Sequence, residues 1–253
     1  ATELLKKAKM HGIKVVYEVD DDLVDLSPEN PSYIYINENK ENIVKLVENA
    51  DKITVTTTEL KNRFLDYGYD NVEIIRNYFV DELFPLNPFK NNETKFLKIG
   101  YFGTLTHDGD LELIHNVILR VKDYLLKENI NVELEVVGGA LNNAQDWYSV
   151  KKLPFYPMPM SNFMKWLNNN VNWDVGIAPL VNTEFNKCKS ELKYIEFSAL
   201  GIPVVASRIE GYEEAIEDGV DGYLATSENE WVSKLVTLLE NPVLRNGMVN
   251  NAH

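Results

Sequence analysis

The sequence predicts an α/β fold built on doubly wound parallel sheets. Short apolar stretches alternate with amphipathic ones along the whole chain of 253 residues, which is the pattern of successive βαβ units. Several of the short stretches are rich in β-branched, aromatic and other apolar residues, such as IKVVYEV at 13–19 and DVGIAPL at 174–180. Strands buried on both faces of a parallel sheet have this composition. With 45% apolar residues, the chain can form one large or two ordinary domains.

The first 96 residues contain short elements. Gly12 ends an amphipathic helix at 2–10, and the strand at 13–19 follows it. After a loop at 23–37 rich in Pro, Asn and Tyr, we expect a helix at 40–49, a strand at 53–56, a helix from Thr58 and a strand at 71–75. Prolines and a polar cluster between 79 and 96 are typical of a linker. We therefore expect a first domain at 1–79, a linker at 80–96 and a second domain at 97–253.

The second domain begins with a strand at 97–102 and continues the alternation. We expect strands at 131–137, 174–180, 203–206 and 222–225, and helices at 111–127, from Ser161, at 213–217, at 228–240 and from Val243. A further short helix is expected at 190–200, because Ser190 is a good N-cap and Gly201 with Pro203 is a stop signal.

The helix at 190–200 carries a cation and an acid side by side. Leu192, Ile195 and Ala199 share one face, which we expect to pack on the sheet, and Lys193 and Glu196 share a neighbouring face. A helix N-terminus and a lysine attract phosphate, and a carboxylate accepts hydrogen bonds from sugar hydroxyls. This spacing is compatible with a phosphorylated ligand, but taken alone it favours an ordinary exposed ion pair.

Two further groups of polar residues follow expected strands. Gly103 comes directly after a strand and before a helix, where a ligand phosphate can approach the backbone, and Thr104, Thr106 and His107 belong to the same turn. We expect His107 to be a hydrogen-bonding loop residue rather than a general base. Three acids, 20–22, end the strand at 13–19, where ligands of open α/β sheets bind. A solvated turn and a divalent-cation site are the alternatives for these acids.

Composition excludes several classes of function. Twenty-five basic and thirty-nine acidic residues give a formal charge of −14, which disfavours binding of nucleic acid over a broad surface. Cys188 is the single cysteine, so no intrachain disulfide is possible and a reducing, cytoplasmic location is expected. We find neither an apolar run of about 20 residues nor a signal-peptide pattern. The chain begins without methionine in an expected helix, which suggests a fragment of a longer protein, with removal of an initiator methionine as the alternative.

The string KYIEFSALGIPVVAS, with DVGIAPL before it and GYEEAIEDGVDGYL after it, resembles the nucleotide-sugar domain of GT-B glycosyltransferases. The similar family is the large retaining one that includes glycogen synthases and many bacterial mannosyltransferases. The resemblance extends from about Lys52 onward, since DKITVTTTELKNRF and NVEIIRNYFVDELF resemble the end of the acceptor-side domain. It implies two Rossmann-like doubly wound parallel sheets, the first of them incomplete.

The resemblance also implies roles for individual residues. Glu196 stands where relatives bind the donor ribose, and Asp20 stands where many relatives carry a histidine near the acceptor. Relatives carry a second glutamate with seven residues between the two, and that position is Cys188 here. Phe155, Tyr156 and Pro157 lie in the segment that contacts the base in relatives, although core packing is the alternative. The residues expected to bind the donor are Gly103, Thr104, Lys189, Ser190, Lys193 and Glu196, and those expected to act in catalysis are Asp20 and Lys193.

The implied reaction is transfer of a sugar from a nucleotide-diphosphate donor to an acceptor hydroxyl with retention, in glycan or cell-surface polysaccharide synthesis. The acceptor would be a glycan, a lipid-linked molecule or a protein, with no metal or other cofactor required. Peripheral membrane association through a missing region is a further expectation. Two alternatives stay open: a nucleotide-sugar epimerase of GT-B fold, and a non-catalytic nucleotide-sugar-binding module, which Cys188 favours.

Overall fold

The computed structural model describes residues 2–28, 30–80, 86–89, 96–103, 108–138, 146–154 and 158–253. The chain forms two compact units. Unit 1 contains Ala1–Asn77, Asn182–Ser190 and Ile209–Gly211, and unit 2 contains Tyr78–Val181, Glu191–Arg208 and Tyr212–His253. Each unit has its own sheet and its own hydrophobic core. The inclusion of two short segments from the second half of the chain in unit 1 was not expected from the sequence.

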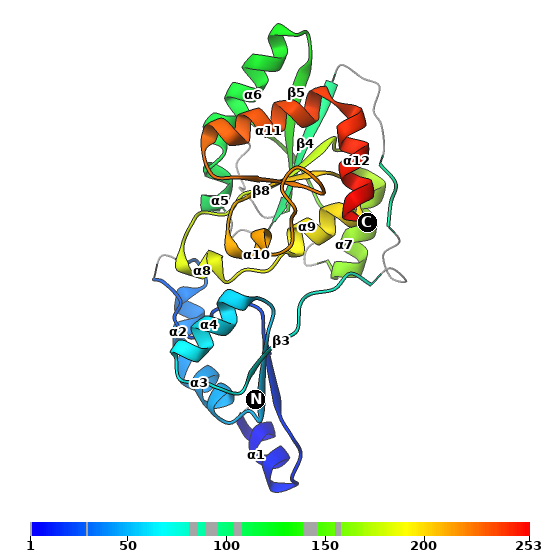
Figure 1. Cartoon of the computed structure of the whole chain (residues 1–253). Coiled ribbons are helices and arrows are strands. Elements are labelled where there is room, and N and C mark those ends of the chain that lie inside the picture. Colours follow the sequence, from blue (N-terminus) through cyan, green and yellow to red (C-terminus); the bar gives the residue numbers. More distant parts are fainter. Residues whose placement is uncertain are drawn as a thin grey trace. The chain divides into compact units, whose positions relative to one another are not determined.

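Unit 1 is a three-stranded parallel sheet with helices. The strands are β1 (Val16–Val19), β2 (Lys52–Val55) and β3 (Val72–Ile74), in the order β1-β2-β3. The helices are α1 (Thr2–Met10), α2 (Tyr33–Glu38), α3 (Lys40–Glu48), α4 (Thr58–Asp66) and α8 (Glu184–Lys187) (Figure 1). Helix α2 replaces part of the loop expected at 23–37, and the strand expected from residue 13 begins three residues later. Val19, Val47, Ile53 and Phe64 form much of the core, to which Cys188 also belongs.

Unit 2 contains a six-stranded parallel sheet in the order β6-β5-β4-β7-β8-β9. The strands are β4 (Phe96–Gly103), β5 (Asn131–Gly138), β6 (Ser149–Lys151), β7 (Val175–Ala178), β8 (Val204–Ser207) and β9 (Tyr223–Ala225). The chain builds outward from β4 in one direction and then, from β7, in the other. This is a doubly wound sheet, as predicted, and the strand order reverses between β4 and β7, where ligands of such sheets bind at the carboxyl ends of the strands.

Helices cover both faces of this sheet. They are α5 (Asp108–Glu112), α6 (His115–Lys127), α7 (Met160–Asn170), α9 (Leu192–Ala199), α11 (Glu228–Glu240) and α12 (Pro242–Ala252), while α10 (Glu210–Glu213) begins in unit 1. Successive residues of β4 point to opposite faces. Tyr101 packs in the core beneath α6 and α11, whereas Phe102 contacts Phe163 of α7 and Phe197 of α9. Figure 1 shows α6 and α11 on one side of the strands and α7 and α9 on the other.

The helix expected at 190–200 begins later than predicted. Helix α9 starts at Leu192, with Glu191 rather than Ser190 at the N-cap position. Its buried face also differs, because Leu192 is 37% exposed whereas Tyr194 and Phe197 are buried. The face of α9 that packs on the sheet is therefore rotated relative to the face inferred from apolar spacing.

Three other expected helices are shifted. The helix expected at 111–127 is divided into α5 and α6, and the one expected at 213–217 is α10 at Glu210–Glu213. Helix α7 begins at Met160 after Pro159, so Ser161 is not its N-cap.

A buried arginine fixes the amino-terminal edge of the sheet. Arg245 of α12 donates hydrogen bonds from Nη1 to Leu238 O at 2.7 Å and Leu239 O at 2.9 Å, at the end of α11. Its Nη2 lies 3.6 Å from Oδ1 of Asp174, just before β7. The other oxygen of Asp174 accepts the Lys98 N–H of β4 at 2.8 Å. Two helices and two strands are thereby joined through one buried ion pair.

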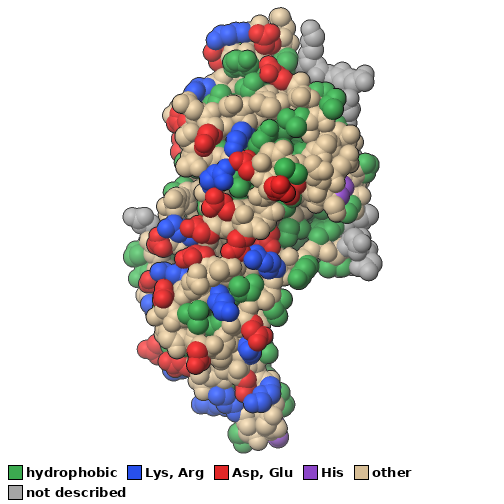
Figure 2. Space-filling model, viewed as in Figure 1, with side chains coloured by type: hydrophobic (Ala, Val, Ile, Leu, Met, Phe, Trp, Pro, Cys, Tyr) green, Lys and Arg blue, Asp and Glu red, His purple; other side chains and the backbone are tan. Residues whose placement is uncertain are grey.

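The described surface carries mixed charge. On the face shown in Figure 2, basic and acidic side chains are interspersed and form no continuous basic area.

Candidate functional site

The carboxyl end of β4 lies at the point where the strand order reverses. Gly103 ends this strand, and a Cβ added there would lie 2.7 Å from the Tyr101 hydroxyl oxygen. Gly138 ends the adjacent β5 with φ +96°, and a Cβ there would overlap Gly103 O. A Cβ would be crowded at both strand ends, and Gly103 is partly exposed, so its backbone is a candidate for close approach by a ligand.

Glu196 is a buried acid on α9. Its side chain is 8% exposed, and burial raises the pKa of its carboxyl group above the ordinary value, while the charge of Lys193 acts in the opposite direction. Among the described residues, no side chain or backbone group donates a hydrogen bond to this carboxylate. A buried carboxylate without donors is costly, so the site favours a ligand that supplies hydroxyl or N–H groups.

Lys193 lies one turn before Glu196. Its ammonium nitrogen is 4.3 Å from the centre of the Phe102 ring, a cation–π contact. The expected alternative of an ordinary exposed ion pair does not hold, because Glu196 is buried. The structure therefore brings three predicted residues, Gly103, Lys193 and Glu196, into unit 2.

Sequence reasoning missed a buried tyrosine near Glu196. Tyr212 is 2% exposed, and its pKa is raised well above the ordinary value by burial and by the negative charges of Glu196, Asp110 and Glu191 around it. The phenol is therefore neutral and able to donate a hydrogen bond. The residues around Tyr212, GYEE at 211–214, show no apolar periodicity, so nothing in the sequence distinguished it from an exposed loop residue.

Two side chains hold the backbone that follows β7. Asp110 Oδ1 accepts the Val181 N–H at 2.8 Å, and Ser207 Oγ accepts the Leu180 N–H at 2.8 Å. Both side chains are buried. Neither was predicted, although an aspartate three residues after His107, next to a predicted ligand loop, was a usable signal.

Lys189 and Ser190 lie in unit 1. Lys189 Nζ is 3.2 Å from Asp21 Oδ1 and 4.7 Å from the centre of the Phe185 ring. Ser190 Oγ accepts a hydrogen bond from Asn77 Nδ2 at 2.9 Å, which explains why it does not cap α9. The charge of Lys189 is thus already opposed by an acid, and its expected role at a donor phosphate stays a prediction.

The three acids after β1 have three different environments. Asp20 is exposed, Asp21 pairs with Lys189, and Asp22 is 1% exposed. Asp22 accepts hydrogen bonds from Tyr67 Oη at 2.6 Å and Arg63 Nε at 3.3 Å, so it is a structural residue. Within the ranges that the structure describes, no three His, Cys, Asp or Glu side chains are placed to hold a metal ion.

Cys188 is a core residue of unit 1. It is fully buried among apolar side chains, and burial raises the pKa of its thiol to about 12. Its carbonyl oxygen accepts a hydrogen bond from Thr57 Oγ1 at 3.0 Å. The position that carries a glutamate in similar sequences therefore holds an inert thiol that packs in a core.

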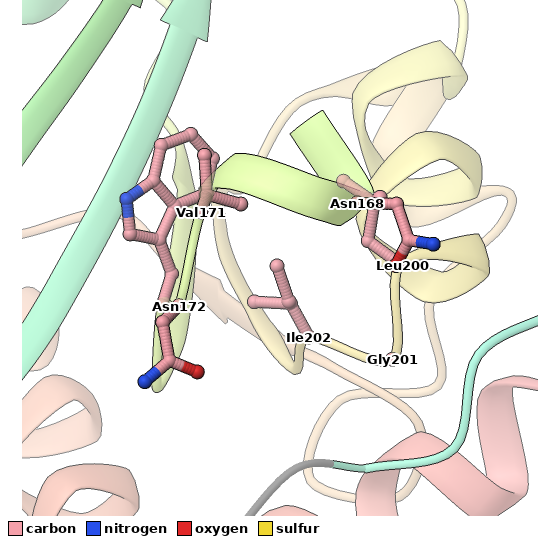
Figure 3. A pocket seen from close by; sticks show the side chains of 7 residues that line it. Asn168, Val171, Asn172, Leu200, Gly201 and Ile202 are labelled. Carbon is pink, nitrogen blue, oxygen red and sulfur yellow. The ribbon is translucent and has the colours of Figure 1, made fainter. Parts of the chain in front are cut away.

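Several expected site residues lie outside the described residues, namely Thr104, Thr106, His107, Phe155, Tyr156 and Pro157. A small pocket in the described part of unit 2 lies elsewhere. Val171, Asn172, Leu200 and Ile202 line it, ahead of β7 and β8 (Figure 3). It is therefore at the amino-terminal edge of the sheet, away from Gly103. No described helix has the length and apolar character that crossing a membrane requires.

Comparison with solved structures shows the fold. A mutant of S. aureus TarM, solved with Fondaparinux, alpha-GlcNAc-glycerol and UDP, is similar with a TM-score of 0.65 and 17% identity over 98% of this chain and 49% of TarM. Anabaena HepE in complex with UDP-glucose gives 0.65 and 18% over 98% of this chain and 68% of HepE. Sucrose-phosphate synthase from Thermosynechococcus elongatus gives 0.63 and 14% over 97% and 64%. The chain is thus an α/β protein of the GT-B type and spans about half the length of TarM.

Comparison of the sequence itself gives one family. No curated protein matches the chain. A model of the family described as glycosyl transferases group 1 matches residues 97–241, from the first residue after the expected linker to the residue that follows α11. These residues make up more than half of the chain and include Gly103, Lys193 and Glu196. The chain therefore belongs to the family glycosyl transferases group 1.

Proposed function

We propose that this chain acts in a glycosyltransferase that moves a sugar from a nucleotide-diphosphate donor to an acceptor hydroxyl with retention, in glycan or cell-surface polysaccharide synthesis. The observation that carries the proposal is Glu196, a buried carboxylate without a hydrogen-bond donor among the described residues of a family member. Ribose hydroxyls are suitable donors for it, because hydrogen bonds to an ionised group are strong and would offset the cost of its burial.

Lys193 and Gly103, which lie in unit 2 with Glu196, are proposed to bind the donor diphosphate. Lys193 supplies a positive charge, and the Gly103 backbone allows close approach. Stabilising the negative charge that develops on the departing diphosphate is the main chemical requirement of the transfer. Thr104, Lys189 and Ser190 are proposed as further donor contacts, and Asp20 is proposed to orient or deprotonate the acceptor hydroxyl. No metal or other cofactor is part of this proposal, and the proposed location is the cytoplasm.

Calorimetric titration with UDP, GDP, ADP and CMP tests the donor site. UDP is the first probe, because TarM and HepE were solved with UDP or UDP-glucose. We expect micromolar binding of one nucleotide, lost in Glu196→Ala and weakened in Glu196→Gln. Glu228→Ala, which removes an exposed acid at the start of α11, is the matched control and should bind as the unaltered chain does. Unchanged affinity in Glu196→Ala would rule out the ribose assignment.

A second candidate is a nucleotide-sugar-binding module without transferase activity. Cys188 favours it, because a buried, protonated thiol cannot take the place of a carboxylate near the transferred sugar. Incubation with radiolabelled UDP-glucose separates the two candidates. Sugar release or transfer above background supports the enzyme, whereas nucleotide binding without either supports the module.

A further inference from the structure

Two consecutive backbone amides at the carboxyl end of β7 are held by two side chains, one from the end of β8 and one from the helix that follows β4. Leu180 donates its N–H to Oγ of Ser207, the last residue of β8. Val181 donates its N–H to Oδ1 of Asp110, which lies on α5 after β4. Both bonds measure 2.8 Å, and the two acceptor side chains are 5% and 6% exposed. The segment leaving β7 is therefore fixed on both sides.

The Asp110 bond crosses the reversal of strand order. It joins the segment that follows Gly103 of β4 to the segment that follows β7, and these are the two segments between which a doubly wound sheet binds its ligand. A hydrogen bond to a buried carboxylate is stronger than one between neutral groups. Asp110 also lies close enough to Tyr212 to act on its ionisation, as does Glu196. The bond is thus part of the same buried polar region as Glu196, the residue proposed to bind the ribose.

We propose that Asp110 is a positioning residue of the donor site, which holds the segment after β7 in the arrangement that binds a nucleoside diphosphate. This inference rests on the proposed function. Asp110 does not contact the ligand in this scheme; it acts through the Val181 amide. Without the bond, the segment samples other arrangements, and the apparent affinity falls in proportion to the fraction of molecules that remain competent.

Asp174 provides a matched comparison at the other end of the same strand. It is 1% exposed, precedes β7, and accepts the Lys98 N–H at 2.8 Å. Asp110 and Asp174 are therefore two buried aspartates that each accept one backbone N–H, at the carboxyl and amino ends of the sheet. Asp174 also pairs with Arg245, so its replacement should destabilise the fold at least as much as that of Asp110. If affinity simply followed stability, Asp174→Ala would weaken binding at least as much as Asp110→Ala, whereas a positioning role predicts that only Asp110 affects the ligand.

The test compares Asp110→Ala, Asp110→Asn and Asp174→Ala at a temperature where each is folded. Amide hydrogen exchange should speed up at Val181 in Asp110→Ala and remain slow in Asp110→Asn, whose amide oxygen still accepts the bond. Titration with UDP, GDP, ADP and CMP should show Kd of the tightest-binding nucleotide rising about tenfold in Asp110→Ala. Asp110→Asn should restore it to within about twofold, and Asp174→Ala should leave it unchanged. If Asp110→Ala fails to fold, Ser207→Ala removes the neighbouring bond at Leu180 and should weaken binding in the same direction.

The outcomes separate this inference from the function on which it rests. No nucleotide binding by the unaltered chain overturns the proposed function and the positioning role together. Binding by the unaltered chain with an equal Kd in Asp110→Ala, despite faster exchange at Val181, overturns the positioning role alone. An equal loss of affinity in Asp174→Ala overturns it as well, because general loss of stability would then account for the effect.

Discussion

Replacing Glu196 with glutamine should stabilise the folded chain while weakening ligand binding. Glutamine keeps the size of the side chain and removes the charge. The carboxylate is 8% exposed and lacks a donor among the described residues, and Lys193 offsets only part of the cost of burying it. Leaving a fully buried group unsatisfied costs about 1–3 kcal/mol, and the Glu196 oxygens, which keep some contact with solvent, should lie at the lower end of that range. We expect Glu196→Gln to recover about 1 kcal/mol, which corresponds to a rise in Tm of about 2–4 °C for a chain of this size.

The gain should depend on pH in a defined direction. Burial raises the folded-state pKa of Glu196 above the ordinary value of 4.5, so the folded state binds this proton more tightly than the unfolded state. The unaltered chain therefore loses stability as pH rises from 4.5 through the raised pKa, and glutamine removes this loss. The advantage of Glu196→Gln should be complete above the raised pKa and vanish below pH 4.5.

Thermal unfolding of both chains between pH 4 and pH 8 measures this difference. Nucleotide titration at pH 7 supplies the second readout, in which we expect Kd to rise about tenfold or more because a hydrogen bond to a charged group is lost. Glu228→Gln is the control, since its exposed side chain should change neither quantity. A Glu196→Gln chain that is less stable than the unaltered one at pH 7 would refute the reasoning, because the carboxylate would then be satisfied in the folded protein.

Three further predictions concern buried residues. Alkylation of Cys188 by iodoacetamide at pH 8 should be at least about a hundredfold slower in the folded chain than in urea, because the thiol is buried and its pKa is raised to about 12; comparable rates would contradict its core position. Arg245→Lys should lower the free energy of unfolding by about 2 kcal/mol in urea titration, since lysine cannot make both carbonyl bonds and still reach Asp174; an unchanged midpoint would argue against the buried ion pair. Gly100→Ala should cost about 3 kcal/mol by the same assay, because its Cβ would overlap the Trp173 ring; a neutral effect would place the indole elsewhere.

The sheets were predictable from the sequence because buried parallel strands have a strong local signal. The expected strands at 53–56, 97–102, 131–137 and 203–206 correspond to β2, β4, β5 and β8 within one residue at each end. Their β-branched and apolar residues suit positions covered on both faces. The doubly wound arrangement followed from the alternation of these strands with amphipathic helices.

Helix boundaries were less predictable where a side chain that could cap the helix bonds a residue distant in the sequence instead. Ser190 has the chemistry of an N-cap, but its hydroxyl bonds Asn77, which lies 113 residues away in the sequence. Local preference therefore lost to a tertiary contact. Likewise, the apolar spacing of α9 suggested a buried Leu192, whereas the polar Glu196 occupies part of the buried face, a departure from apolar patterning of the kind that occurs at functional sites.

The residues of the candidate site likewise include one that the local sequence predicted and one that it did not. Glu196 was identified through the residues around it in the sequence, which resemble a family motif. The Asp110–Val181 bond spans 71 residues, and no local pattern specifies which backbone amide a loop aspartate will bind. Contacts of this kind become visible only when strand order is known.

The membership of Cys188 in the core of unit 1 has a consequence for the order in which the chain folds. The other members of that core come from the first 72 residues, and the bond from Thr57 to the Cys188 carbonyl closes a loop of 131 residues. On the ribosome, unit 1 cannot complete its interior until residue 188 has emerged, long after its own strands have been made. Non-local closure of this kind is slow, so the early part of the chain waits with an unfilled apolar surface. Chaperone dependence during synthesis should therefore be greatest before the segment 182–190 appears.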